Sequence, residues 1–271
     1  MAGAAPAPRR LVLTRAEWAL LVRVSTITAP PGFEPARVDE PALRAAARAL
    51  SARRVVTGGS DDPRDCVPVK SVAVNLAVAT APAATVRVEV VMGGRGLRAF
   101  YSLSGPWGGS LFTLADAAVE LSLYPAETLG RELLRAVPPP AGSAPVAARV
   151  AAALGDGRDA ALTGRLPLSA LAGSARTGGV VTDTVTAPEA ELAARVAGQR
   201  VGTLRCLVSG RGGTGILVGQ FSWLATADGW TGLRPDPDGT DRRMVALHRV
   251  NRDDLGVWVA PLLAEILAAA R

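Results

Sequence analysis

Two stretches of the chain repeat the same order of segments, and this repeat limits the fold more than any other feature. In each stretch, short segments of alternating apolar and polar residues are separated by glycine-rich turns, and an apolar-striped helix follows. Such alternation is typical of half-buried β-strands. Because tight turns join consecutive strands, each stretch predicts an antiparallel meander.

The two stretches predict corresponding sets of elements. In the first half we expect strands and then a helix at residues 85–92, 97–103, 110–114, 119–124 and 126–137. In the second half the same order falls at residues 204–209, 216–225, 230–234, 243–249 and 252–270. A helix also precedes each half, at residues 39–51 and 188–197, and a further one covers residues 15–22.

A direct alignment supports a duplication. Residues 119–130 can be laid on residues 245–256 without a gap, and the identical pairs are Val119/Val245, Leu121/Leu247, Leu129/Leu255 and Gly130/Gly256. Repeated units of this size predict an internal duplication. The expected fold class is therefore α+β, with a mainly antiparallel central sheet, flanking helices and two quasi-two-fold-related halves.

A proline-rich interruption lies near the middle of the chain. Pro138, Pro139 and Pro140 are consecutive, and Pro145 follows them. Consecutive prolines favour an extended connector over a helix or a central strand. We expect residues 1–137 to form the N-terminal half, 138–146 a connector and 147–271 the C-terminal half, with both halves in one compact domain. Residues 173–186 are expected to form a loop, and the sequence leaves open whether it is ordered.

The chain is basic, which permits a negatively charged partner but is not evidence for one. The net charge is +6 and the isoelectric point is about 10.5. Such a balance permits contact with nucleic acid through long-range attraction. The arginines are nevertheless scattered, and no basic run is interleaved with aromatic residues. An arginine-rich nucleic-acid-associated protein is therefore an alternative that rests on charge alone, and we expect no nucleic-acid partner.

The motifs of catalysis and cofactor binding do not assemble. Residues 210–215 match GxGxxG, but a strand rather than a helix is expected after them, so we interpret them as a glycine-rich hairpin. The single histidine, His248, alternates with apolar neighbours on an expected strand. One histidine and two cysteines are too few for a usual zinc site. We expect no catalytic residue, no cofactor and no metal; an enzyme of unrecognised type is the second alternative.

The cysteines and the apolar segments indicate in which cellular compartment the protein is expected. Cys66 and Cys206 either form one disulfide or are two buried thiols. The apolar stretch that follows Arg10 is broken by Arg15 and Glu17, so it does not fit a signal peptide. No uncharged stretch reaches the length of a membrane-spanning helix. We therefore expect a cytoplasmic protein without membrane insertion.

Aromatic residues in the second meander suggest a partner-binding surface. Phe221 and Trp223 are two positions apart, so they share one face of a strand, and Trp230 lies on the next strand. This face either packs under a helix or is exposed to bind a partner, because Trp is a frequent anchor of interfaces. Our hypothesis places partner contacts at Phe221, Trp223, Trp230 and Leu233.

Three regions together resemble the EspG family of ESX (type VII) secretion-associated proteins of actinobacteria. They comprise residues 43–56 with 69–90, residues 119–123 with 128–138, and residues 230–238 with 249–256. The likeness extends from about Leu13 to the C-terminus, and its motifs are diffuse. It implies a mixed fold with a mainly antiparallel sheet and quasi-two-fold halves, in agreement with the duplication.

The resemblance also implies a function. Family members are cytosolic, non-enzymatic chaperones that hold a helical secretion substrate, typically the PPE half of a PE–PPE dimer, at an aggregation-prone tip. The client of this chain is then expected to be a PPE- or WXG-type helical protein that is kept soluble. No short family motif marks the contact residues, and neither the individual client nor the oligomeric state follows from the sequence.

Overall fold

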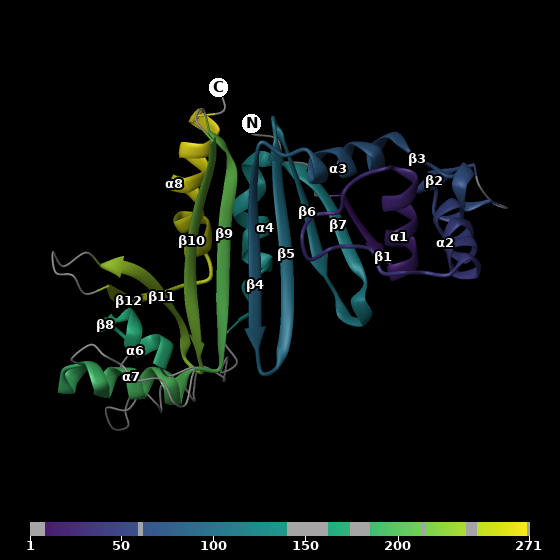
Figure 1. The fold of residues 1–271 in the computed structure, drawn as a ribbon. Coiled ribbons are helices and arrows are strands. Elements are labelled where there is room, and N and C mark those ends of the chain that lie inside the picture. Colours follow the sequence, from purple (N-terminus) through teal and green to yellow (C-terminus); the bar gives the residue numbers. More distant parts are fainter. Residues whose placement is uncertain are drawn as a thin grey trace, which may run out of the picture.

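The chain folds around one large sheet (Figure 1). The computed structural model describes residues 9–58, 62–139, 162–173, 185–212, 215–236 and 243–269. Ten strands form the sheet in the order β1-β7-β6-β5-β4-β9-β10-β11-β12-β8, and neighbouring strands pair antiparallel throughout. Their bounds are β1 Arg9–Leu13, β4 Ala84–Met92, β5 Arg95–Ser104, β6 Trp107–Thr113, β7 Val119–Pro125, β8 Gly164–Pro167, β9 Gly202–Gly212, β10 Gly215–Thr226, β11 Gly229–Asp236 and β12 Met244–Val250.

The two meanders meet at the centre of the sheet. β4 pairs with β9 from Ala84 opposite Gly210 to Met92 opposite Gly202, and the remaining strands of each meander follow outward in chain order. The helices after the meanders also meet, since a Cβ atom on Gly256 would lie 3.7 Å from the Cα atom of Gly130. The α+β fold with its antiparallel sheet is confirmed. The order of elements agrees with an internal duplication, which stays a prediction.

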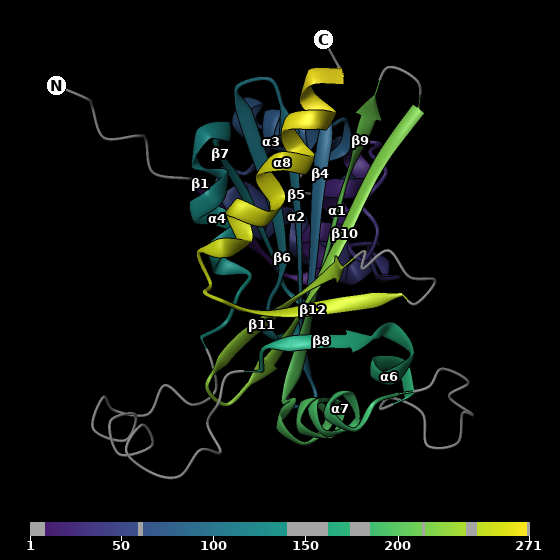
Figure 2. The ribbon, with the colours of Figure 1, turned by 90° about the vertical axis from the view of Figure 1, so that its left-hand side faces the viewer.

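One face of the sheet is covered by two helices. α4 (Leu129–Arg135) follows the short 3-10 turn η3 (Ala126–Thr128), and α8 (Asp254–Ala269) crosses the sheet diagonally in Figure 2. The alternate residues of β4, β9 and β10 that point toward these helices form the largest core cluster with them. We call this side the closed face. Pro261 lies inside α8, and the helix continues through it.

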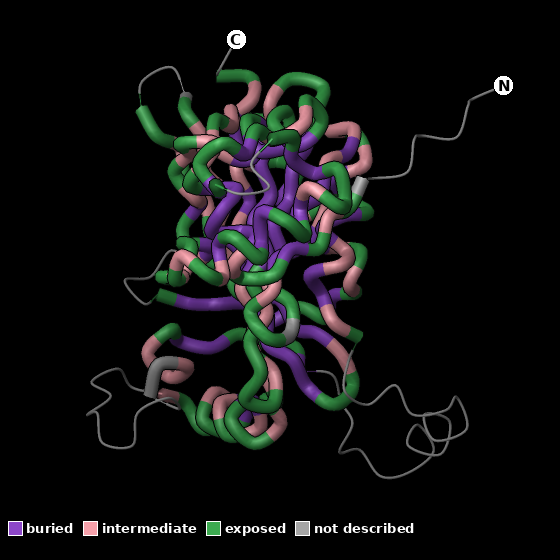
Figure 3. The backbone as a smooth tube through the Cα atoms, turned by 90° about the vertical axis from the view of Figure 1, so that its right-hand side faces the viewer, coloured by how far each residue is buried: buried purple, intermediate pink, exposed green. Residues whose placement is uncertain are grey.

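Helices at the two ends cover parts of the opposite side. α1 (Arg15–Val24), α2 (Glu40–Ala52) and α3 (Lys70–Thr80) form a second core with β5, β6 and β7. α6 (Leu168–Gly173) and α7 (Ala187–Gln199) belong to a smaller third core at the β8 and β12 end. Seen from the α1–α3 side, buried segments gather where these helices meet the sheet, and the α6–α7 end carries more exposed residues (Figure 3).

Most of the expected elements are present, with boundary shifts of a few residues. The short pair β2 (Val56–Thr57) and β3 (Val67–Pro68), the 3-10 turns η1 (Pro63–Asp65) and η2 (Ala115–Ala117), and β1, β8 and α3 were not anticipated. Thr14 caps α1, because its hydroxyl accepts from the Glu17 N–H at 3.2 Å. The helix expected at 126–137 is divided into η3 and α4.

Several sequence-based expectations have plain outcomes. The GxGxxG segment lies at a hairpin, with Gly212 paired to Gly215 at the ends of β9 and β10. Cys66 and Cys206 are free, buried thiols. Most of the connector 138–146 and of the loop 173–186 lies outside the described residues, so the division into halves stays a prediction. Among the described helices, none is both long and apolar enough to span a bilayer.

Candidate functional site

The residues proposed from the sequence for partner contact lie mainly inside the molecule. Trp223 and Trp230 are 0% and 2% exposed and pack in the core beneath α8. The ring centroids of Trp223 and Trp258 are 5.7 Å apart, and those of Phe221 and Trp258 are 5.3 Å apart. Burial under a helix is the packing alternative considered for this strand face. Contact of a partner with the two buried indoles would require α8 to move away.

The remaining two proposed residues are partly buried. Phe221 packs against the core beneath α8, and Leu233 points to the other side of the sheet, where it joins the α6–α7 cluster. The structure therefore does not bring all four side chains to one surface. Their role in partner binding stays a prediction.

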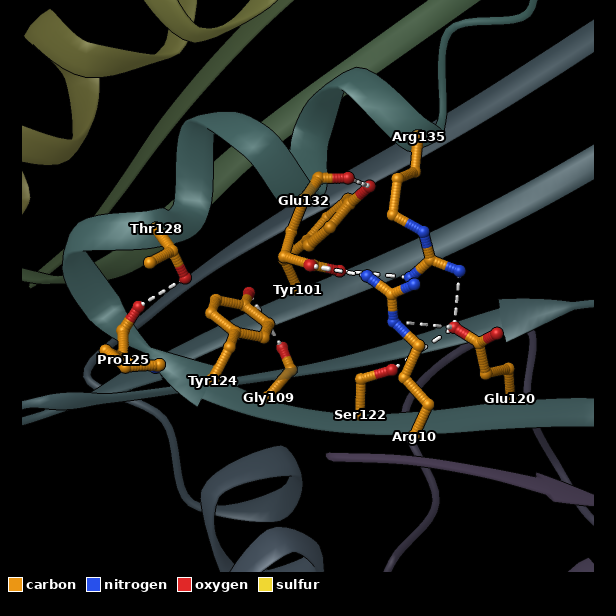
Figure 4. A network of polar contacts seen from close by, with 10 residues as sticks. All are labelled: Arg10, Tyr101, Gly109, Glu120, Ser122, Tyr124, Pro125, Thr128, Glu132 and Arg135. Carbon is orange, nitrogen blue, oxygen red and sulfur yellow. Dashed lines mark hydrogen bonds and ion pairs between the residues drawn. The ribbon is translucent and has the colours of Figure 1, made fainter. Parts of the chain in front are cut away.

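A charged cluster with two buried carboxylates, Glu120 and Glu132, lies under α4 (Figure 4). Arg135 of α4 donates to Glu120 of β7 at 2.5 Å and to Glu132 at 3.0 Å, while Arg10 of β1 donates to Glu132 at 2.9 Å. Burial disfavours the charge of Arg135, but hydrogen bonds to Glu120 and Glu132 act in the opposite direction, and the pKa of its guanidinium is raised. Each carboxylate is thus matched by a cation. The cluster links β1 and β7 to α4. Because both carboxylates are paired with arginines, they are poorly placed for acid–base chemistry.

Buried hydroxyls beside this cluster are also committed to structural bonds. The Tyr101 hydroxyl donates to the Glu132 carbonyl at 2.8 Å, and the Tyr124 hydroxyl donates to the Gly109 carbonyl at 3.2 Å. Burial raises the pKa of both phenols above their ordinary value. Neither phenol is therefore available as a base near neutral pH.

The opposite side of the central strands carries several exposed side chains, and we call it the open face. It consists of side chains on the side of β4, β9 and β10 that points away from α8. Val91, Val218 and Ile216 on it are 52%, 62% and 76% exposed. Its members are Arg87, Glu89, Val91, Arg205, Leu207, Arg211, Ile216, Val218 and Gln220.

A hollow of about 220 Å³ lies in the open face, lined by Arg87, Glu89, Arg205, Cys206, Leu207 and Gln220. Glu89 accepts from Arg87 at 2.6 Å and lies opposite Arg205 in the β4–β9 ladder. Within the described residues, no ion pair joins Arg205 or Arg211 to a carboxylate. The hollow therefore offers cationic groups beside exposed apolar side chains.

This surface is suited to recognition rather than to nucleophilic chemistry. The Cys206 side chain lies in the core of the closed face, and burial raises the pKa of its thiol, so it stays protonated near neutral pH. His248 is exposed on β12, away from the residues that line the hollow. Among the residues that the structure describes, no three His, Cys, Asp or Glu side chains come together as a metal site requires.

Sequence reasoning missed the open face, although a signal for it was present. Residues 85–91 alternate between apolar and polar side chains, with Val86, Val88 and Val90 on one side and Arg87 and Glu89 on the other. The same period in residues 204–208 places Arg205 beside Glu89 once the two strands pair. The alternation identifies the strands, but the pairing of β4 with β9 is needed to assemble the surface.

Comparisons with known proteins identify the fold. No family model matches the chain, and no curated protein matches its sequence. The structure is similar to that of the type VII secretion system chaperone EspG5 of Mycobacterium tuberculosis, solved in complex with a PE25–PPE41 dimer. The TM-score is 0.59 at 8% sequence identity, and the match covers 95% of this chain and 96% of that chain. The expected EspG-like fold is thereby confirmed.

Proposed function

We propose, from its EspG-like fold, that this chain is a non-enzymatic cytosolic chaperone that binds a helical type VII secretion substrate and keeps it soluble. The observation that carries the proposal is the similarity to EspG5, which extends over nearly the whole of both chains. The substrate we propose is a PPE- or WXG-type helical protein, as the sequence resemblance implies. A shared fold is compatible with different functions, so the proposal depends on the site as well.

The open face supplies a surface that fits such a client. Val91 is exposed at one end of this face, where it pairs with Thr203. Ile216 and Val218 are exposed at the other end, where Val218 pairs with Ser209, and the hollow lies between the two ends. Ile216 and Val218 are two positions apart on one strand face, and we infer that a partner covers this exposed apolar pair. A helix with an apolar stripe would bury these side chains, and the same contact would shield the stripe of the client from aggregation.

The charges of the open face favour an acidic client segment. Glu89 is already paired with Arg87, whereas Arg205 and Arg211 have no ion-pair partner among the described residues. Carboxylates that flank the apolar stripe of the client would therefore find cations beside the patch. Such complementary charges mainly raise the association rate and the specificity.

The test is capture from native cytosol by the immobilised full chain at about 0.15 M salt, with bound proteins identified by mass spectrometry. The expected result is a helical type VII substrate, and its co-expression with this chain should increase its soluble fraction. Recovery of nucleic acid alone, lost as salt rises, would replace the proposal with the charge-driven alternative. Recovery of neither would overturn the chaperone function.

Substitutions test whether the client contacts the open face. Val91→Asp and Arg205→Glu should each lower client capture at least about tenfold, since a loss of about 1.4 kcal/mol is tenfold in affinity. Val257→Asp is the matched control. Val257 is 65% exposed but belongs to α8, which lies on the opposite side of the sheet from the open face. Equal capture by all three variants, each with an unchanged circular-dichroism melt, would move the contact away from the open face.

A further inference from the structure

The N-terminal half of β10 has a free edge. β9 pairs with β10 along residues 215–225, whereas β11 pairs only with residues 222–226. Beyond Leu233, β11 continues along β12 instead and turns away from β10 (Figure 1). Within the described part of the chain, no strand pairs with the outer edge of residues 215–221. Their outward backbone N–H and C=O groups are a template for another strand.

This edge lacks the protection that the terminal edges of the sheet carry. At the β1 edge, Arg53 donates to the Val12 carbonyl at 2.7 Å, so that a backbone acceptor is occupied. The β8 edge is four residues long and ends at Pro167. In contrast, residues 215–221 read Gly-Ile-Leu-Val-Gly-Gln-Phe, with neither a charge nor a proline. Charges and prolines are the usual devices that prevent strand addition.

We propose that the free edge of β10 pairs with the same edge of a second copy of this chain. The pairing is antiparallel and symmetric about Val218, the middle residue of the free segment. It places Val218 opposite its own copy and Ile216 opposite Gln220. A two-fold axis gives such a self-complementary contact, which is the commonest symmetry of protein dimers.

The side chains of the segment support self-pairing. Because the segment is uncharged, an antiparallel partner of identical sequence places no like charges opposite one another. The exposed Ile216 and Val218 of one copy would lie beside those of the other on the joined open faces. Pairing therefore shields apolar side chains as well as backbone groups.

The nearest cations do not oppose the pairing. Arg211 lies opposite Ile216 on β9, one strand away from the free edge. In the dimer the two Arg211 residues are at least three strand spacings apart, about 14 Å. The Debye length at physiological salt is about 8 Å, so their repulsion is largely screened.

The pairing is tested on the full chain in the absence of a client, so that its failure is distinct from failure of the chaperone function. Light scattering after size-exclusion chromatography, over a concentration series, should give the mass of a dimer that dissociates on dilution. Val218→Lys should shift the distribution to the monomer, because it places two ammonium groups opposite each other. Its side chain points outward, and the circular-dichroism melt should be unchanged.

A crosslink tests the register. Val218→Cys should form an intermolecular disulfide under mild oxidation, because directly opposed residues of antiparallel strands have Cα atoms about 4.5 to 5.5 Å apart. Val257→Cys is the control of similar exposure on α8 and should not crosslink. The two native cysteines are buried. Crosslinking of both variants at one rate would overturn the register and the interface.

Two further results would also overturn the proposal. One is a monomer at every concentration for the unmodified chain. The other is a monomer in which the backbone amides of residues 216–221 are protected from hydrogen exchange, which would identify a segment of the same chain as the occupant of the edge. Either result would leave client capture unaffected.

Discussion

The two faces of the central strands are built from alternate residues of the same strands, and they differ in burial and in charge. On the closed face, Val86, Val88 and Cys206 are at most 1% exposed and pack beneath α8. On the open face, their neighbours Arg87, Glu89 and Arg205 are charged and reach solvent. Successive side chains of a strand point to opposite faces, so one sequence segment can serve stability and recognition independently.

The difference is that stability should depend on one face and binding on the other. Substitutions on the closed face should lower the free energy of unfolding, while substitutions on the open face should change interactions and leave unfolding nearly unchanged.

The largest effect is expected for Trp223→Ala. The indole is fully buried among Phe221, Trp230 and Trp258, and its removal should lower the free energy of unfolding by about 3 to 5 kcal/mol. Urea denaturation measures this loss. Trp223→Phe is the control and should cost much less, because it keeps an aromatic ring and removes an indole N–H that has no acceptor among the described residues. Similar losses for both variants would contradict cavity formation as the cause.

A glycine on the closed face should be the next most sensitive position. A Cβ atom on Gly210 would lie 2.7 Å from the Ala83 carbonyl oxygen and 2.3 Å from Ile266 of α8. Since backbone cannot yield easily, Gly210→Ala should destabilise the fold by about 1 to 3 kcal/mol.

Gly198→Ala provides a control of opposite sign. Gly198 lies in α7 with no atom near the added methyl group. This variant should stabilise the protein by about 0.5 to 1 kcal/mol. A destabilised Gly198→Ala together with a neutral Gly210→Ala would reverse the assignment of tight packing to the closed face.

Alkaline pH should lower the free energy of unfolding through a group on the closed face. Burial raises the pKa of the Cys206 thiol, so the unfolded chain loses this proton at lower pH than the folded chain. Stability is thus fully present below the unfolded pKa, about 8.5, and falls as pH rises above it. We expect a loss of about 1.5 to 2 kcal/mol between about pH 7.5 and pH 9.5, with a small contribution from the buried tyrosines.

The same titration in Cys206→Ala separates the thiol from other groups. The variant is less stable at every pH because it lacks the buried sulfur atom, but its stability should vary less between about pH 7.5 and pH 9.5. An unchanged pH dependence would show that the Cys206 thiol does not cause it.

The smallest effect is expected on the open face. Val91→Thr changes a side chain that is 52% exposed, so the free energy of unfolding should change by no more than about 0.5 kcal/mol. A loss above about 1 kcal/mol in urea denaturation would mean that this surface is part of the core.

The sequence predicts the elements better than the site. The alternation in residues 85–92 and the three-and-four spacing in residues 252–270 identify β4 and α8, because each pattern is local. In contrast, α3 was missed since Lys70–Thr80 is apolar nearly all round, and the short β1 gives too few residues for a periodic signal.

The position of the aromatic residues could not be settled by local pattern. The spacing of Phe221 and Trp223 establishes that they share a strand face, but the strand does not show whether a helix covers that face. Trp258, more than thirty positions later in the chain, provides the cover. The open face was missed for the same reason, because it is assembled by pairing of β4 with β9.

The pairing of β4 with β9 also constrains how the chain reaches its fold. Residues 84–92 pair with residues 202–210, so this pairing forms only after most of the polypeptide has been synthesised. Contacts between residues so distant in sequence carry a large loop-closure cost and slow folding. Until then, β4 presents an unpaired, valine-rich edge on the nascent chain. A protein proposed to protect others from aggregation thus passes through a stage in which its own central strand needs protection.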